Sequence, residues 1–389
     1  MTATASVVPV EAGDWETFRR QMPIAQTWAY FDHAAVAPLP EPTRRALVDW
    51  AEEAARSGDT VWPAWSRKVE GLRGRAAQLI GASPEEIALI HNTTEGVNLV
   101  AEGFPWQPGD NIVTLADEFP TNQYPWMNLA ERGVQTRRVP TEDGAVDLDR
   151  LADACDHRTR IVSVSWVSYS SGWRNDLERI AAITHERGAL FFLDAIQALG
   201  VFELDVRRTP VDFLAADGHK WLLGIEGAGI CYIRREHLKR LRPVGVGWNS
   251  VVRSHDFQHI ELALKDSADR YEGGSQCMAG MIALAASLEL LMSYGAGALG
   301  RRILEVTEQA CRRLREIGAV LHSDRSGQHA SGIVAFELPG RDPLALKKHC
   351  LGRNVVLSCR AGRLRISPHA YNNEQDIQRL VQALSDFGF

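Results

Sequence analysis

Two short apolar runs in this sequence each end in side chains that can do chemistry. The first run, residues 190–193, ends at Asp194, and the second, residues 211–216, is followed closely by His219 and Lys220. Such runs are typical of parallel strands buried on both faces. Because ligands bind beyond the carboxyl ends of such strands, we expect these side chains to meet in one crevice.

An aspartate and a lysine in one crevice suit the chemistry of pyridoxal phosphate. Lys220 would hold the cofactor aldehyde as a Schiff base, and Asp194 would keep the pyridine nitrogen protonated, so that the ring accepts electrons from a carbanion. The alternative is a surface lysine and a helix-capping aspartate. The glycines between residues 224 and 229 do not form a dinucleotide loop, because they precede the apolar run 230–233 and open no helix.

The stretch 189–229 resembles the class V aminotransferases among the fold-type I pyridoxal phosphate enzymes. Relatives in that family include cysteine desulfurases, selenocysteine lyases and isopenicillin N epimerase. The resemblance implies an α/β fold with a mainly parallel central sheet flanked by helices and a smaller α+β domain. It also implies cofactor contacts from Gln197 and His219. The residues that carry it are Asp194, Gln197, Gly200, Asp205, Asp212, Phe213, Gly218-His219-Lys220-Trp221, Gly224, Gly227 and Gly229.

Further cofactor contacts are expected where other predicted strands end. Asn92 and Glu95 have the spacing of a capping box, and a helix N-terminus also offers free N–H groups to a phosphate. The resemblance favours phosphate binding over capping alone and places Thr93, Thr94 and Glu95 nearest the phosphate. It places Phe119 on the pyridine ring, where relatives carry an aromatic residue or a histidine. A phenylalanine can stack there but cannot transfer a proton.

Two serines complete the expected cofactor site. Ser168 ends a predicted strand and could contact the 3′-oxygen of the cofactor. Its neighbour Tyr169 occupies the asparagine position of the desulfurases, which leaves that contact unassigned. Ser275, in the segment Tyr271-Glu272-Gly273-Gly274-Ser275, resembles the hydroxyl that reaches the phosphate of the neighbouring subunit. The resemblance therefore implies a homodimer with active sites at the subunit interface.

The substrate is expected to be a small amino acid. Arg365 matches the family's carboxylate-binding arginine, whose planar fork suits a bidentate contact; a surface ion pair is the alternative. His33 is expected to face the substrate, with a structural role as its alternative. Asp217 stands where desulfurases place a serine on the phosphate. An ionised carboxylate beside a dianion is repulsive, so Asp217 either turns away or is protonated.

The cysteines bear on which reaction the enzyme performs. A desulfurase needs a nucleophilic cysteine on a mobile loop, but Cys350 ends a predicted helix (343–351), and only four residues separate Arg360 from Arg365. That loop is therefore absent, and Cys359 is at most a neighbour of the substrate. We expect a class V aminotransferase-like enzyme that transaminates or epimerises an α-amino acid. A C–S or C–Se lyase or desulfurase is the alternative, and a non-catalytic binding protein is a remote one.

Composition and length are those of a globular protein of two domains. Of the 389 residues, 45% are apolar and 24% charged, and the formal net charge is −6. This argues against nucleic acid or a membrane as partner. Six scattered cysteines without metal-ligand spacing and the lack of a signal sequence predict no metal and a cytoplasmic setting. We predict an N-terminal arm that joins the small domain (1–28), a large cofactor-binding domain (29–289) and a small C-terminal domain (290–389).

Overall fold

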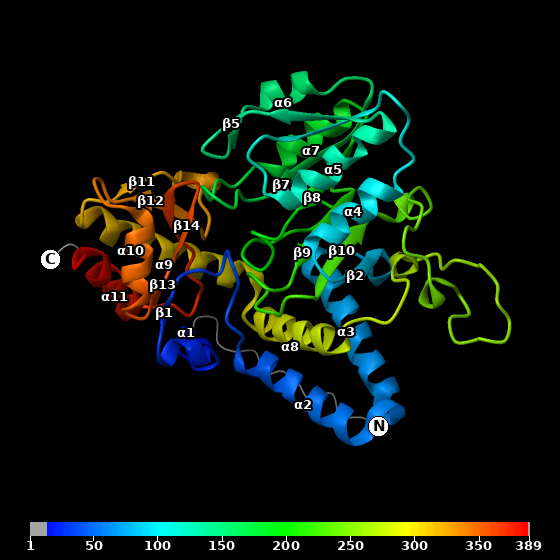
Figure 1. Ribbon diagram of the computed structural model, residues 1–389, viewed down its shortest axis with the longest axis horizontal. Coiled ribbons are helices and arrows are strands. Elements are labelled where there is room, and N and C mark those ends of the chain that lie inside the picture. Colours follow the sequence, from blue (N-terminus) through cyan, green and yellow to red (C-terminus); the bar gives the residue numbers. More distant parts are fainter. Residues whose placement is uncertain (1–13, 388–389) are drawn as a thin grey trace.

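The computed structural model describes residues 14–387, so the first half of the predicted N-terminal arm lies outside the described residues. The centre of the protein is a seven-stranded sheet of order β2-β10-β9-β8-β7-β3-β4, in which only β10 runs antiparallel to its neighbours. This is the mainly parallel sheet that the sequence predicts (Figure 1). Its strands are β2 (Ile87–Ile90), β3 (Asn111–Leu115), β4 (Gln135–Val139), β7 (Thr159–Ser165), β8 (Leu190–Asp194), β9 (Phe213–Asp217) and β10 (Gly229–Ile233).

Helices cover both faces of this sheet, because its strands are apolar on both sides. Successive residues of β8 alternate between two hydrophobic cores, with Phe191 and Leu193 in one and Phe192 in the other. The first core includes residues of α3, α7 and α8, and the second includes residues of α4 and α5. The helices of this part are α2 (Glu41–Ser57), α3 (Trp62–Ile80), α4 (Thr93–Gly103), α5 (Tyr124–Met127), α6 (Leu148–Ala154), α7 (Leu177–Glu186) and α8 (Met278–Tyr294).

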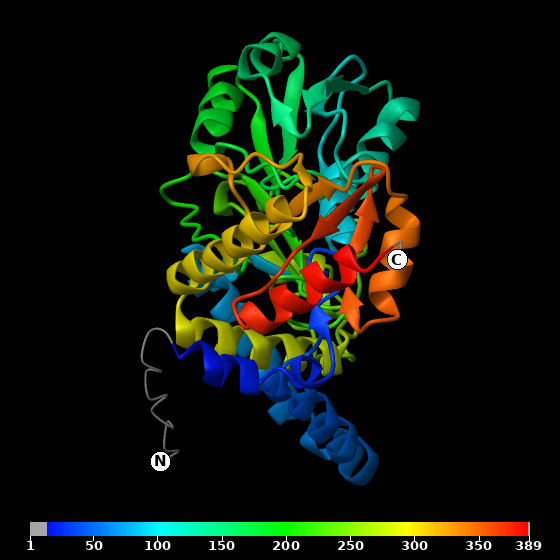
Figure 2. The same ribbon diagram turned by 90° about the vertical axis from the view of Figure 1, so that its left-hand side faces the viewer.

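The C-terminal part forms a second, antiparallel sheet of order β11-β12-β15-β14 with a hydrophobic core of its own. Its helices α9 and α11 lie side by side (Figure 2). This is the smaller α+β unit that the resemblance implies. The elements are α9 (Ala296–Glu316), β11 (Val320–Leu321), β12 (Val334–Glu337), α10 (Pro343–Leu351), β14 (Ser358–Arg360), β15 (Arg363–Ile366) and α11 (Glu374–Ser385).

The start of the described chain packs against the C-terminal part. Arg19 of α1 (Trp15–Arg20) makes an ion pair of 2.6 Å with Asp376. Strand β1 (Ala29–Tyr30) pairs in parallel with β13 (Val355–Val356), so a contact crosses the predicted border at residue 29. After β13 the chain changes partner, and β14 pairs with β15 instead. The domain limits stay a prediction.

Two smaller features complete the fold. A short hairpin, β5 (Thr141–Glu142) and β6 (Ala145–Val146), follows β4. Among residues 14–387, no single helix is long and apolar enough to cross a membrane. Helices α8 and α9 reach that length only together, and they are bent by 82° relative to each other.

Candidate active site

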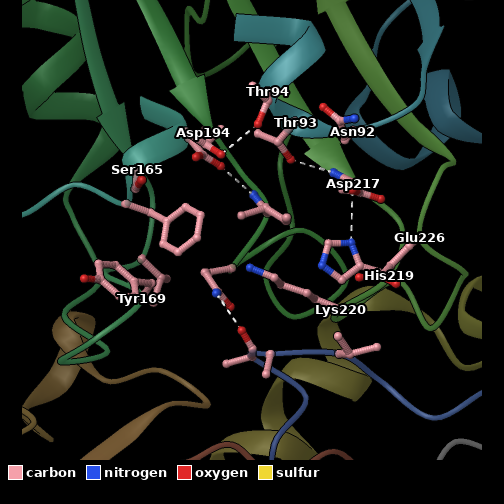
Figure 3. A pocket seen from close by; sticks show the side chains of 18 of the residues that line it. Asn92, Thr93, Thr94, Ser165, Tyr169, Asp194, Asp217, His219, Lys220 and Glu226 are labelled. Carbon is pink, nitrogen blue, oxygen red and sulfur yellow. Dashed lines mark hydrogen bonds and ion pairs between the residues drawn. The ribbon is translucent and has the colours of Figure 1, made fainter. Parts of the chain in front are cut away.

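A cavity of about 380 Å³ opens at the carboxyl ends of the central strands (Figure 3). It lies where β8 ends at Asp194 and β9 ends at Asp217, and the C-terminal sheet closes it with β14 and β15. The parallel pairing of β8 with β9 brings these strand ends together. Eight of the predicted site residues line this cavity: Thr93, Thr94, Phe119, Asp194, Gln197, His219, Lys220 and Arg365.

Lys220 points into the cavity from the turn after β9. The turn is tight, because the N–H of Gly218 donates to the carbonyl of Ala228 at 2.8 Å, and a Cβ on Gly218 would meet that oxygen at 2.8 Å. Only 9% of Lys220 is exposed, and this burial lowers its pKa to about 8. Its Nζ lies 5.6 Å from the centroid of the Phe119 ring. A buried amine that loses its proton near neutral pH can attack an aldehyde.

Among the described residues, Asp194 has no cationic partner at hydrogen-bond distance. It is 2% exposed, and its Oδ1 accepts one hydrogen bond, of 3.1 Å, from the backbone N–H of Ile196. Burial raises its pKa to about 6. A protonated pyridine nitrogen in the cavity would supply the missing partner, so this carboxylate fits the cofactor.

Glu118 is a buried acid near the site that the sequence analysis missed. Its Oε1 accepts a hydrogen bond of 2.7 Å from the backbone N–H of Ser165, and its Oε2 pairs with the hydroxyl of that serine. Burial raises the pKa of Glu118 to about 8, and the charge of Asp194 adds to the effect. The carboxyl is therefore protonated at neutral pH. Its place beside Phe119, just after β3, is the signal that could have found it.

Helix α4 begins at the cavity and leaves N–H groups available to a phosphate. Asn92 caps the helix by accepting from the N–H of Glu95 at 2.9 Å. Thr93 accepts from the N–H of Asp217 at 3.0 Å, and Thr94 lies 2.8 Å from the hydroxyl of Thr121. These contacts fix the threonines at the positive end of an eleven-residue helix, where an anion is stabilised.

The side chain of Glu95 is not among the residues that line the cavity, so only its backbone is placed to approach a phosphate there. Its carboxylate turns back and lies 2.9 Å from Nδ1 of His91, and it also accepts from the backbone N–H of that residue. Only half of the expected capping box is therefore formed, because Asn92 caps the N–H of Glu95 while the Glu95 carboxylate binds His91, ahead of the helix.

Asp217 lines the cavity and faces His219, and its two alternatives, that it turns away from the phosphate or is protonated, stay predictions. Its Oδ2 lies 3.1 Å from Nδ1 of His219 (Figure 3). Its Oδ1 is buried and accepts no hydrogen bond from a described residue. Both residues line the cavity, together with Thr93 and Thr94 at the start of α4.

Arg365 is buried, with 1% of its surface exposed, so the alternative of a surface ion pair is excluded. Its guanidinium donates to Asp32 at 3.0 Å, to the hydroxyl of Ser358 at 3.0 Å and to the carbonyl of Tyr169 at 2.5 Å. These bonds use three of its five N–H donors and leave two for a carboxylate in the cavity.

Gln197 is held by the protein at both ends of its amide. Its nitrogen donates to the carbonyl of Ala34 at 3.0 Å, and its oxygen accepts from the indole N–H of Trp221 at 3.0 Å. These bonds fix the orientation of the amide at the wall of the cavity.

His33 does not face the cavity, and its structural alternative describes it better. It is fully buried; its Nδ1 lies 2.9 Å from the carbonyl of Ser367 and its Nε2 lies 3.0 Å from the hydroxyl of Tyr371. Burial lowers its pKa to about 4, so the ring is neutral. Both ring nitrogens are occupied, which leaves none for a substrate.

Two predicted serines also lie away from the cavity. Ser168 turns into its own loop, where its hydroxyl lies 3.3 Å from that of Ser170, while Ser165 and Tyr169 line the cavity instead. Ser275 lines a separate cavity of about 240 Å³. The prediction that it serves the neighbouring subunit is compatible with this place and is not tested by it.

None of the six cysteines, all of which are among the described residues, lines the cavity. Cys350 is fully buried in the C-terminal core, and burial raises its pKa to about 12. Cys359 lies on β14 and is partly buried. Thiolates, not thiols, are nucleophiles, so Cys350 is inert at neutral pH.

A buried lysine, an unpartnered aspartate and a helix N-terminus around one cavity define a fold-type I pyridoxal phosphate enzyme. The chain belongs to the aminotransferase class-V family, whose family model matches residues 29–380. Pyridoxal phosphate is therefore its cofactor, as predicted.

Relatives with assigned names include enzymes of sulfur chemistry. A probable cysteine desulfurase from Methanothermobacter thermautotrophicus is 32% identical over 95% of this chain and 97% of its own length. The structure of the cysteine desulfurase CsdA from Escherichia coli matches with a TM-score of 0.86 and 26% identity, over 95% of this chain and 97% of that one. The cystine C–S lyase C-DES, in complex with cysteine persulfide, matches with a TM-score of 0.89 over 95% and 100% of the chains. At 23% identity, this last likeness shows the fold alone.

Proposed function

We propose that this protein is a pyridoxal phosphate-dependent C–S lyase that cleaves a cysteine-type amino acid by β-elimination. The names of the relatives support sulfur chemistry over the transamination or epimerisation that we expected from the sequence. The observation that carries elimination over desulfuration is a cavity with lysine and arginine but no cysteine among its described lining residues.

Three side chains would act directly on the substrate or the cofactor. Arg365 binds the α-carboxylate with its two remaining N–H donors and so orients the substrate. Lys220 holds the cofactor and, once released, its amine removes the α-proton. Asp194 keeps the pyridine nitrogen protonated. When bound, the cofactor supplies an electron sink for the pair left at Cα.

The remaining groups would hold the cofactor in place. Thr93 and Thr94 at the start of α4, together with His219, surround the phosphate. Phe119 stacks on the ring without transferring a proton, so Lys220 is the base within reach of Cα. Gln197, fixed at both ends, is suited to contact the 3′-oxygen.

Elimination needs no protein thiol. Removal of the α-proton and cleavage of the Cβ–S bond release the sulfur as a thiol, and hydrolysis of the remaining fragment gives pyruvate and ammonia. For cysteine, one water is consumed and one hydrogen sulfide is released. A desulfurase instead passes the sulfur to its own cysteine and leaves alanine.

We further propose a homodimer. Ser275 lines its own cavity away from Lys220, as a residue serving a second subunit would. Three large apolar side chains in the segment after β10 are well exposed, namely Phe257 (69%), Ile260 (89%) and Leu262 (73%), and a partner subunit would cover them. Sedimentation of the purified protein tests this, and a monomer at all concentrations would contradict it.

Product analysis tests the proposed reaction. Purified holoenzyme is incubated with L-cysteine and with S-ethyl-L-cysteine, and pyruvate, alanine and sulfide or ethanethiol are measured. Pyruvate and the thiol in equal amounts are expected. Alanine as the main product would favour a desulfurase, and amino-group transfer to an added keto acid would favour transamination.

A further inference from the structure

One face of the hairpin formed by β14 and β15 carries three arginines. Its two connecting residues, Ala361 (φ 48°) and Gly362 (φ 76°), both have positive φ, as in the type I′ turns that close tight hairpins. Arg360 lies directly opposite Arg363, and Arg365 follows two residues later on the same strand. Opposed residues share a face and so do residues two apart, so all three side chains project from one face.

Two of these arginines have carboxylate partners, and the third has none among the described residues. Arg365 pairs with Asp32 at 3.0 Å, and Arg363 pairs with Asp143 of the β5–β6 hairpin. Within residues 14–387, the guanidinium of Arg360 donates only to the carbonyl of the residue before it, at 2.8 Å. It is thus a partly buried guanidinium whose charge the described part of the chain does not neutralise.

Arg360 lines the same cavity as Lys220 and Arg365. Burial is the largest cause of the lowered pKa of Lys220, and the positive charge of Arg360 lowers that pKa further. The charge of Arg360 therefore acts inside the site. None of the carboxylates that line the cavity makes an ion pair with it; these are Asp194, Asp217 and Glu226. A guanidinium without a counter-ion at the wall of a cavity is suited to a planar anion.

We infer that Arg360 binds a second carboxylate, carried by the side chain of the substrate, while Arg365 binds the α-carboxylate. This rests on the proposed function and narrows its substrate to a cysteine whose sulfur bears an acidic substituent. Because one rigid hairpin carries both arginines, their separation selects the length of that substituent. The reaction stays the same: the Cβ–S bond breaks, and the acidic thiol leaves with pyruvate and ammonia as the other products.

A pair of nearly isosteric substrates tests the inference on the holoenzyme. S-(2-carboxyethyl)-L-cysteine carries the second carboxylate, and S-(2-carbamoylethyl)-L-cysteine carries a neutral amide in its place. We expect kcat/KM for pyruvate formation to favour the acid by about 10-fold to 100-fold, the range for a hydrogen bond to a charged group. Arg360→Gln should abolish this preference by slowing the acid alone. Arg363→Gln is the matched control, since it removes an arginine of the same face that already has a partner, and it should keep the preference.

A charge reversal and a binding measurement separate this inference from the proposed reaction. Arg360→Glu should turn the preference toward S-(2-aminoethyl)-L-cysteine. If no substrate yields pyruvate, the absorbance change of the cofactor on titration with L-glutamate and L-glutamine gives the two affinities directly. A glutamate preference that Arg360→Gln removes would support the inference even if the proposed reaction failed. Equal kcat/KM and equal affinities for acid and amide in the unmodified enzyme, or a preference unchanged in Arg360→Gln, would overturn it.

Discussion

Replacing Asp194 by asparagine should stabilise the cofactor-free protein while it removes most of the activity. The carboxyl is 2% exposed, and burial raises its pKa from 3.8 to about 6. When an acid has a higher pKa in the folded protein than in the unfolded chain, its ionisation destabilises the folded state. This destabilisation reaches its full size above the folded pKa. The effect fades as the pH falls toward the unfolded pKa. At about 1.4 kcal/mol per pKa unit, the ionised carboxyl costs about 3 kcal/mol at pH 7 and about half of that at pH 5.

Asparagine would recover part of this free energy. Its side-chain oxygen can keep the hydrogen bond from the N–H of Ile196, but its buried amide nitrogen lacks a partner, which costs about 1–2 kcal/mol. We therefore expect cofactor-free Asp194→Asn to gain about 1–2 kcal/mol in the free energy of unfolding at pH 7. With the cofactor bound, the unmodified protein should instead be more stable than Asp194→Asn, because the protonated pyridine nitrogen forms an ion pair with the aspartate only. Activity should fall by orders of magnitude.

Urea unfolding followed by tryptophan fluorescence measures this effect, with and without pyridoxal phosphate, at pH 7 and pH 5. Asp153→Asn on α6, an exposed position, makes the same chemical change without burial and should alter little. Cofactor-free Asp194→Asn that is less stable than the unmodified protein at pH 7 would refute the reasoning. So would a stability difference that is the same at both pH values.

Further predictions concern the cofactor lysine and two buried acids. Lys220→Ala should bind the cofactor without an absorbance band that borohydride removes, at about 420 nm, and should not turn over. In the unmodified apoprotein, that band should form faster as the pH rises to about 8 and no faster above, since burial lowers the pKa of Lys220 to about 8. Glu118→Gln should change kcat by less than about threefold at pH 7, because burial raises its pKa to about 8 and keeps it protonated. Burial alone would raise the pKa of Asp212, but hydrogen bonds from His185 and His237 hold it well below its usual range. Asp212→Asn should therefore lower the free energy of unfolding at pH 7 by about 3 kcal/mol, a loss that shrinks in acid as the aspartate itself is protonated.

The positions of Asp194 and Lys220 could be predicted because they follow from chain direction. Parallel strands place their carboxyl ends at one edge of the sheet, so two apolar runs that end in polar residues suffice to locate the site. The mainly parallel sheet and the smaller α+β unit were expected from the family resemblance, whereas strand β4, which has few apolar residues, was not predicted. No side-chain partner has to be known for the features that were predicted.

Side-chain direction was harder to predict, because it depends on partners distant in sequence. His33 binds Ser367 and Tyr371, which lie more than three hundred residues away, and nothing near His33 in the sequence signals this. The side chain of Glu95 binds the nearby His91, a contact that neither the phosphate prediction nor the capping pattern indicated. Arg360 was overlooked for another reason. The short spacing to Arg365 indicated a missing loop. In the structure, the same short spacing forms a tight hairpin, and this hairpin places a second arginine at the wall of the cavity.

The most direct test of the proposed elimination compares the unmodified enzyme with a Cys350→Ser, Cys359→Ser double variant in a single turnover of L-cysteine. We expect both proteins to release pyruvate and sulfide in equal amounts and at equal rates. Mass spectrometry of the protein should find no added sulfur on any cysteine. Alanine as the product, with sulfur bound to Cys350 or Cys359 and activity lost in the variant, would contradict the proposal and make the protein a desulfurase.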